Sequence, residues 1–148
     1  MKSVAALGIL LAGLIGLSPT AIADAEYLTS EQTRSLNLPF SDAVRVNSLL
    51  ILSGQLGNLP GSTTLAPGGI KAEARQALEN VKRILEANGS SMDRVIKCTV
   101  MMADIGEWAD FNEVYVSYFP GNKPARSAFA AAGLAYDGRL ELECWAAD

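Results

Sequence analysis

The chain has 148 residues with 12 basic and 16 acidic side chains, and it contains two cysteines and no histidine. The lack of histidine excludes Ser-His-Asp and Cys-His catalysis as well as His-based metal sites, and two cysteines are too few for a metal cage. An acidic chain without a cluster of Lys and Arg argues against nucleic acid and anionic membranes as partners. Small molecules and other proteins remain as candidate partners.

The first 23 residues have the pattern of a secretory signal peptide. Lys2 supplies a positive start, an apolar run follows over residues 4–17, and Ala21-Ile22-Ala23 gives a small-x-small cleavage pattern. The run is shorter than the roughly 20 residues that a membrane span needs. We therefore expect an exported protein, periplasmic or secreted, whose mature chain over residues 24–148 is one domain without a membrane attachment.

Extended runs come first in the mature chain, after an arm over residues 24–40. Residues 43–47 and 48–54 predict two strands of a hairpin with its turn at Asn47-Ser48. The second strand ends at Ser53-Gly54, where a glycine leaves room for a ligand or another backbone. A glycine that only ends a strand is commoner than one at a ligand site, so this pattern alone assigns no site. The glycines and prolines of residues 57–69 then predict a loop.

A helix and a strong strand follow the loop. Apolar residues recur at helical spacing from Ile70 onward, and Asn88-Gly89 predicts the end of this helix. The strand over residues 95–102 alternates in polarity. Its alternation predicts one face with Ile96, Cys98, Val100 and Met102, and an opposite face with Val95, Lys97, Thr99 and Met101.

A second helix is predicted after Asp104, which has the capping-box spacing to Glu107. Its apolar stripe consists of Trp108, Phe111, Tyr115 and Phe119. Asn112 lies on this stripe, where an amide needs hydrogen-bond partners from the backbone or from a ligand. For a single asparagine, hydrogen bonds within the protein are commoner than hydrogen bonds to a ligand.

Arg126 stands at the start of the next strand, directly after Pro124-Ala125, and the proline holds the chain extended there. Its planar fork of donors fits a carboxylate, and a cation on a short apolar segment needs a partner. That partner is either an anionic ligand or a carboxylate of the protein. An ion pair with Glu141 or Glu143 that stabilises a subunit interface is the purely structural alternative.

The last strand, over residues 140–146, places Glu141, Glu143 and Trp145 on one face and Cys144 on the other. Cys98 and Cys144 are able to face the same side and could pair in an exported protein. We favour two separate buried cysteines, because the domain is long enough to fold without a covalent link.

The predicted order of elements is therefore β-β-α-β-α-β-β. It corresponds to an α+β domain in which two helices cover one face of a mixed sheet. The other face carries both charged and apolar side chains, and such a face is often completed by another subunit.

Five short motifs occur in a fixed order along the mature chain. They are Ser53-Gly54-Gln55, Gln76-Ala77-Leu78-Glu79-Asn80-Val81, Asn112 with Tyr115 and Phe119, Pro124-Ala125-Arg126-Ser127, and Glu141-Leu142-Glu143. In this order they resemble the Rid (YjgF-type) family, the reactive-intermediate or enamine/imine deaminases. The resemblance extends from about Phe40 to the end of the chain, and several ordered motifs are more specific than any one of them.

The resemblance implies a chorismate-mutase-like α+β subunit and a homotrimer with three sites between subunits. It also implies hydrolysis of 2-imino acids, formed from enamines such as 2-aminoacrylate, to 2-keto acids and ammonia, without a metal or organic cofactor. By position, Arg126 would hold the substrate carboxylate and Glu141 would polarise the attacking water. Ser53 and Gly54 would line the pocket, with Asn112 beside it.

Two positions depart from the family pattern and bear on substrate preference and rate. Phe40 replaces a tyrosine common near the pocket, and Ala128 replaces a cysteine found two residues after the arginine in the best-known members. An alternative function for the same cleft is binding of small carboxylates without turnover. A role in holding unfolded proteins is a third, for which the sequence offers no dedicated surface.

Overall fold

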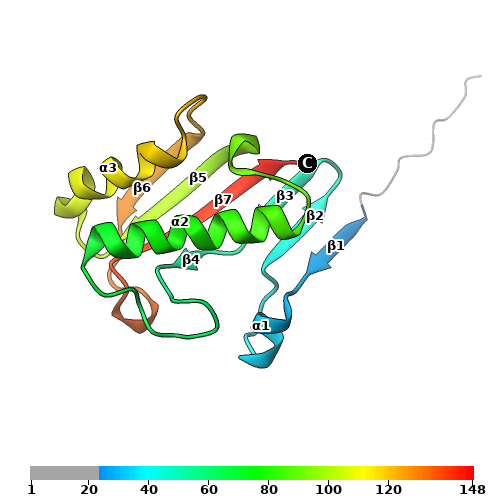
Figure 1. The fold of residues 1–148 in the computed structure, drawn as a ribbon, viewed down its shortest axis with the longest axis horizontal. Helices are drawn as coiled ribbons and strands as arrows, with labels where there is room; N and C mark the ends of the chain where they lie inside the picture. Colours follow the sequence, from blue (N-terminus) through cyan, green and yellow to red (C-terminus); the bar gives the residue numbers. More distant parts are fainter. Residues whose placement is uncertain (1–23) are drawn as a thin grey trace, which may run out of the picture.

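A mixed β-sheet with two long helices on one face forms the described part of the chain, residues 24–148 (Figure 1). In this computed structural model, the predicted signal peptide lies outside the described residues. The strands are β1 (Ala25–Leu28), β2 (Ala43–Val46), β3 (Leu49–Leu52), β4 (Gln55–Leu56), β5 (Val95–Met102), β6 (Ala125–Ala130) and β7 (Leu140–Ala147). The helices are α1 (Glu31–Ser35), α2 (Ile70–Ala87) and α3 (Trp108–Tyr118).

The strand order across the sheet is β1-β2-β3-β7-β5-β6, and β4 pairs with β7 beside β3. β5 and β6 are parallel, and the other pairs are antiparallel. Helices α2 and α3 lie side by side across the same face of this sheet (Figure 1). The predicted order of strands and helices is therefore confirmed, and β1, α1 and β4 are additions to it.

The hairpin and the first long helix form where the sequence predicts them. Asn47 occupies the turn between β2 and β3 with a positive φ of 52°, a conformation that asparagine tolerates better than most residues. Helix α2 ends at Ala87, and Gly89 follows with a φ of 79°. The apolar side of α2 is buried on the sheet and includes Ala74, Ala77, Leu78, Val81 and Leu85.

The predicted alternation of β5 is wrong at its first two residues. Val95 is buried and Ile96 is 46% exposed, the reverse of the prediction. The cause is a register shift in the pairing of β5 with β7 between Val95 and Lys97, which places one extra residue in β5. From Cys98 onward the alternation is as predicted.

Cys98 and Cys144 form a disulfide, so the prediction of two separate cysteines is wrong. The two residues are direct partners in the antiparallel pairing of β5 and β7, and both side chains are fully buried beneath the helices. Directly opposed residues bring their Cβ atoms within bonding reach of each other. The bond therefore links two adjacent interior strands of the sheet.

The N-terminal arm has more structure than the sequence suggested. β1 pairs with β2 at the edge of the sheet, and Ser30 caps the short helix α1 by accepting from the amide of Thr33 at 3.2 Å. Asp42 fixes the same segment, because its carboxylate accepts from the Ser30 amide at 2.5 Å and from the Thr33 hydroxyl at 2.6 Å.

No helix among the described residues is long and apolar enough to cross a membrane.

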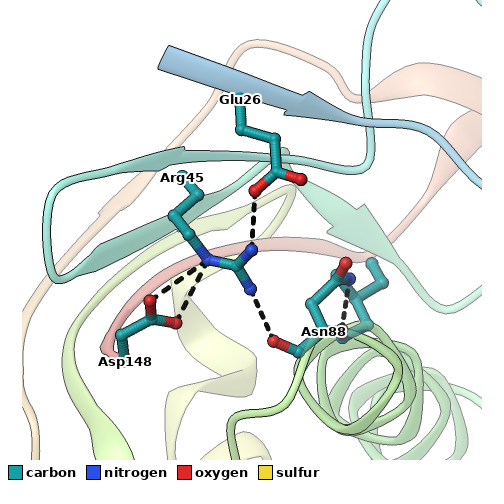
Figure 2. Close-up of polar contacts among 5 residues, drawn as sticks. Glu26, Arg45, Asn88 and Asp148 are labelled. Carbon is teal, nitrogen blue, oxygen red and sulfur yellow. Dashed lines mark hydrogen bonds and ion pairs between the residues drawn. The ribbon is translucent and has the colours of Figure 1, made fainter. Parts of the chain in front are cut away.

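Arg45 joins three parts of the fold at the end of the sheet (Figure 2). Its guanidinium contacts Glu26 of β1 at 2.6 Å and Asp148 at 3.2 Å, and it donates to the backbone carbonyl of Asn88 at 2.7 Å. These contacts connect the first strand, the residue after β7 and the end of α2. They fix the edge strand against the rest of the sheet.

Candidate functional site

The two residues proposed for the chemistry lie on opposite faces of the sheet within one chain. Arg126 of β6 pairs with Cys98 of β5, whose side chain is buried beneath the helices. Glu141 of β7 pairs with Met101 of β5, which has the opposite phase in that strand. Partners in register point to the same side of a sheet, and neighbours along a strand point to opposite sides. One chain therefore offers two separate half-sites.

The helix-side half-site surrounds the guanidinium of Arg126 with aromatic rings. The guanidinium carbon lies 4.4 Å from the ring centre of Trp108 and 4.5 Å from that of Tyr115, both on α3. Its Nη1 donates to the Oδ1 of Asn112 at 2.8 Å. Helical spacing brings these three α3 residues to one side, so the apolar stripe predicted from the sequence becomes the support of the arginine.

Arg126 forms no ion pair within residues 24–148. The predicted structural alternative, an ion pair with Glu141 or Glu143, is therefore not formed inside one chain. Burial raises the pKa of the neighbouring Tyr115 phenol above its ordinary value, and the charge of Arg126 opposes part of that rise. The half-site is thus partly desolvated and holds a positive charge that needs an anion.

The other half-site centres on the carboxylate of Glu141, which lies directly over Gly54. A Cβ added at Gly54 would stand 1.9 Å from Oε1 of Glu141, so only glycine leaves space for the carboxylate there. Burial, and secondly the negative charge of Glu143, raise the pKa of Glu141 above its ordinary value. A carboxylate shifted in this direction is a better proton acceptor near neutral pH.

A cavity of about 230 Å³ opens beside Glu141. The arm before β2 forms one wall with Phe40, and the loop of residues 57–66 forms the opposite wall. Asn80 of α2 fixes this loop, because its side-chain amide donates to the carbonyl oxygens of Leu56 and Asn58 at 3.1 and 3.0 Å. A buried amide with all of its bonds made inside the protein is a rigid support.

The remaining predicted site residues divide between these two locations. Phe40 and Gly54 line the cavity with Glu141, whereas Ala128 is half-buried on the same sheet face as Arg126. Ser53 is not among the lining residues, and its hydroxyl donates to the carbonyl of Ser41 at 2.7 Å. Ser53 therefore shapes the strand end rather than presenting a free hydroxyl.

Tyr136 is a cavity residue that sequence reasoning did not find. It lines the cavity near Glu141 and adopts a φ of 57°, as does Asp137 after it. Such left-handed conformations are uncommon for residues other than glycine, and they concentrate at functional sites. No local pattern in the sequence marks this position, because only the folded loop brings the ring to the cavity.

Comparisons with known proteins identify the family of the chain. The family described as Endoribonuclease L-PSP matches residues 30–148. A protein of Bos taurus named 2-iminobutanoate/2-iminopropanoate deaminase is 46% identical over 105 residues, which are 71% of this chain and 77% of that protein.

Two solved structures from Escherichia coli are also similar. The YjgF gene product superimposes with a TM-score of 0.75 at 31% identity, and the match covers 82% of this chain and 98% of that one. TdcF with bound serine gives a TM-score of 0.70 at 35% identity, covering 74% and 88%. These likenesses confirm the predicted fold class, a chorismate-mutase-like α+β fold. The chain belongs to the endoribonuclease L-PSP family, the YjgF/RidA family.

Proposed function

We propose that this protein is a hydrolytic deaminase that converts 2-imino acids and their enamine tautomers to 2-keto acids and ammonia. The observation that carries the proposal is the half-buried guanidinium of Arg126. Aromatic rings and an amide hold it in place, and it has no carboxylate partner among residues 24–148. A cation fixed in this way is prepared for the carboxylate of a substrate. The deaminase name of the bovine relative supports the same reaction.

The chemistry uses one water molecule and no redox step. With the substrate carboxylate on Arg126, Glu141 accepts a proton from water as its oxygen bonds to the imine carbon. The C=N π electrons move to nitrogen, which takes up the proton that Glu141 received. In the resulting carbinolamine the carboxylate of Glu141 takes the hydroxyl proton and passes it to nitrogen, so that the C–N bond breaks, ammonia leaves and the ketone forms. The raised pKa of Glu141 brings the carboxyl group closer to the neutral range, in which one group serves as both proton acceptor and proton donor.

The proposed assembly is a homotrimer with each site shared by two subunits. Because Arg126 and Glu141 face opposite sides of one sheet, a substrate that touches both needs one of them from a neighbouring chain. Phe129 and Trp145 support a contact on the face away from the helices, since they are 48% and 37% exposed. A cyclic assembly repeats one such contact around an axis.

Export of the mature chain, without attachment to a membrane, is also part of the proposal. The Cys98–Cys144 disulfide supports it, because structural disulfides persist mainly in oxidising compartments. Cell fractionation followed by thiol labelling of the denatured protein tests this location. We expect the protein in the exported fraction with both cysteines unlabelled. Protein that is absent from this fraction, and whose cysteines are fully labelled where it is found, would contradict export.

The activity is tested with imines that an amino-acid oxidase generates in the presence of semicarbazide, which traps them. Active protein lowers the amount of trapped imine, whereas Arg126→Ala and Glu141→Gln lower it by no more than buffer does. Wild-type protein that protects no better than buffer, yet binds a 2-keto acid in calorimetry, would replace the deaminase by a carboxylate-binding function.

A further inference from the structure

The reaction at Glu141 leaves Tyr136 without a role, although its side chain lines the same cavity. We propose that Tyr136 is a further catalytic residue, whose phenolic hydroxyl forms a hydrogen bond with the nitrogen of the imine while Glu141 activates the water. This proposal rests on the proposed function, since it takes the reacting carbon to lie at Glu141. It concerns the group of this chain that contacts the nitrogen until ammonia leaves.

Chain order and packing place Tyr136 beside Glu141. The short helical turn Ala135–Asp137, which contains Tyr136, comes just before β7, and Glu141 is the second residue of that strand. Gly138 packs against Leu56, because a Cβ added at this glycine would stand 2.6 Å from Cδ2 of Leu56. Leu56 of β4 is in turn the register partner of Glu141. The turn therefore lies at the same end of the sheet as β4 and Glu141 (Figure 1).

The hydroxyl of Tyr136 is available to a ligand. The side chain is 52% exposed, and its hydroxyl makes no hydrogen bond within residues 24–148. By contrast, the hydroxyl of Tyr118 donates to Oε1 of Glu79 at 2.6 Å. A phenol both donates and accepts, so it suits a nitrogen that is first an imine and then departing ammonia.

The backbone holds Tyr136 in an unfavourable conformation. Its φ and ψ are 57° and 24°, and Asp137 has the same φ. Left-handed backbone is unusual for a bulky residue and persists only where the surrounding structure enforces it. Arg139 supplies part of that structure, because its amide donates to Glu73 at 2.9 Å and its carbonyl accepts from the amide of Ala103 at 2.9 Å. The fold therefore keeps the ring at the cavity at a cost in stability, which is typical of residues retained for function.

Other polar side chains of the cavity are less suited to this contact. Gln32 and Thr63 stand on the two opposing walls, whereas the segment of Tyr136 leads directly into the strand of Glu141. Arg83 carries a permanent positive charge, which repels a nitrogen that takes up a proton. A hydroxyl donor is free of this repulsion.

Removal of the hydroxyl alone tests the role of Tyr136. Tyr136→Phe keeps the ring, and Tyr27→Phe is the matched control, because Tyr27 of β1 is 72% exposed and does not line the cavity. Both variants are compared with wild type by kcat/KM in the semicarbazide assay and by urea unfolding. Calorimetry then gives the affinities for 2-oxobutanoate and butanoate. The ketone oxygen of 2-oxobutanoate takes the place of the imine nitrogen, and butanoate has no such atom.

Tyr136→Phe is expected to lower kcat/KM about tenfold, since one hydrogen bond of ordinary strength corresponds to about that factor. The preference of wild type for 2-oxobutanoate over butanoate should fall by a similar factor. The urea midpoint should not change, because the hydroxyl has no partner within residues 24–148, and Tyr27→Phe should behave as wild type throughout.

Three results would overturn the role of Tyr136. They are a kcat/KM of Tyr136→Phe within about threefold of wild type, an unchanged ligand preference, and a loss of activity that parallels a loss of stability or occurs equally in Tyr27→Phe. The proposed function fails separately. If wild type hydrolyses no imine but Tyr136→Phe loses the preference for 2-oxobutanoate, the deaminase is refuted and the contact of the hydroxyl with the group on carbon 2 is confirmed.

Discussion

Arg126→Lys tests whether Arg126 binds the substrate carboxylate through two parallel N–H donors or only through its positive charge. Nη1 donates to Asn112, so Nε and Nη2 form the edge left for a substrate carboxylate. Lysine keeps the charge but loses one of two charged hydrogen bonds, about 1.5–3 kcal/mol. It also loses the stacking of the planar group on Trp108 and Tyr115, about 0.5–1 kcal/mol. The sum, about 2–4 kcal/mol, corresponds to a loss in kcat/KM of about 30- to 900-fold.

The semicarbazide assay at several imine concentrations measures this loss and separates KM from kcat. Arg94→Lys is the matched control, because Arg94 is exposed in the short helical turn before β5 and makes none of the contacts of the site. That control should retain wild-type kinetics. A kcat/KM for Arg126→Lys within about threefold of wild type would refute bidentate binding of the substrate carboxylate. Arg126 would then keep only a role in the subunit interface.

Three further changes probe the other half-site and the disulfide. Gly54→Ala should lower kcat about a hundredfold with little change in KM. The added Cβ would stand 1.9 Å from Oε1 of Glu141 and would displace the carboxylate. Full activity would contradict the placement of Glu141 over Gly54. Glu143→Gln should move the acid limb of the pH–rate profile to lower pH, because a negative charge that raises the pKa of Glu141 is removed; an unmoved limb would exclude Glu141 as the titrating base. Urea unfolding at fixed protein concentration should show that Cys98→Ala/Cys144→Ala loses about 4 kcal/mol, the entropy of a loop closed over a separation of 46 residues; a loss below about 1 kcal/mol would contradict a bond that constrains the unfolded chain.

Local sequence patterns predicted the elements whose signals lie within a few residues. The end of α2 follows from Asn88-Gly89, and the aromatic stripe of α3 follows from helical spacing. The phase of β5 at Ile96 could not be predicted, because the register shift there depends on how β7 pairs with it. Hydrophobic periodicity describes one strand and contains no information on its partner.

The parts of the site that escaped prediction depend on contacts between distant segments. The pairing of Cys98 with Cys144 requires the register of two strands 46 residues apart. The resemblance named Arg126 and Glu141 as members of one site, but their opposite faces are known only once β6 and β7 are both placed against β5. Arg45 likewise joins segments that no local pattern connects.

A shared site between subunits is the central claim, and mixing two inactive variants tests it most directly. Arg126→Ala and Glu141→Gln subunits are combined in equal amounts, dissociated and reassembled, and the activity is compared with that of each variant treated alone. If every site takes Arg126 from one chain and Glu141 from the next, about a quarter of the sites in random mixed trimers contain both native residues. The mixture should therefore recover about a quarter of wild-type activity, and a mixture as inactive as its two components would contradict the shared site.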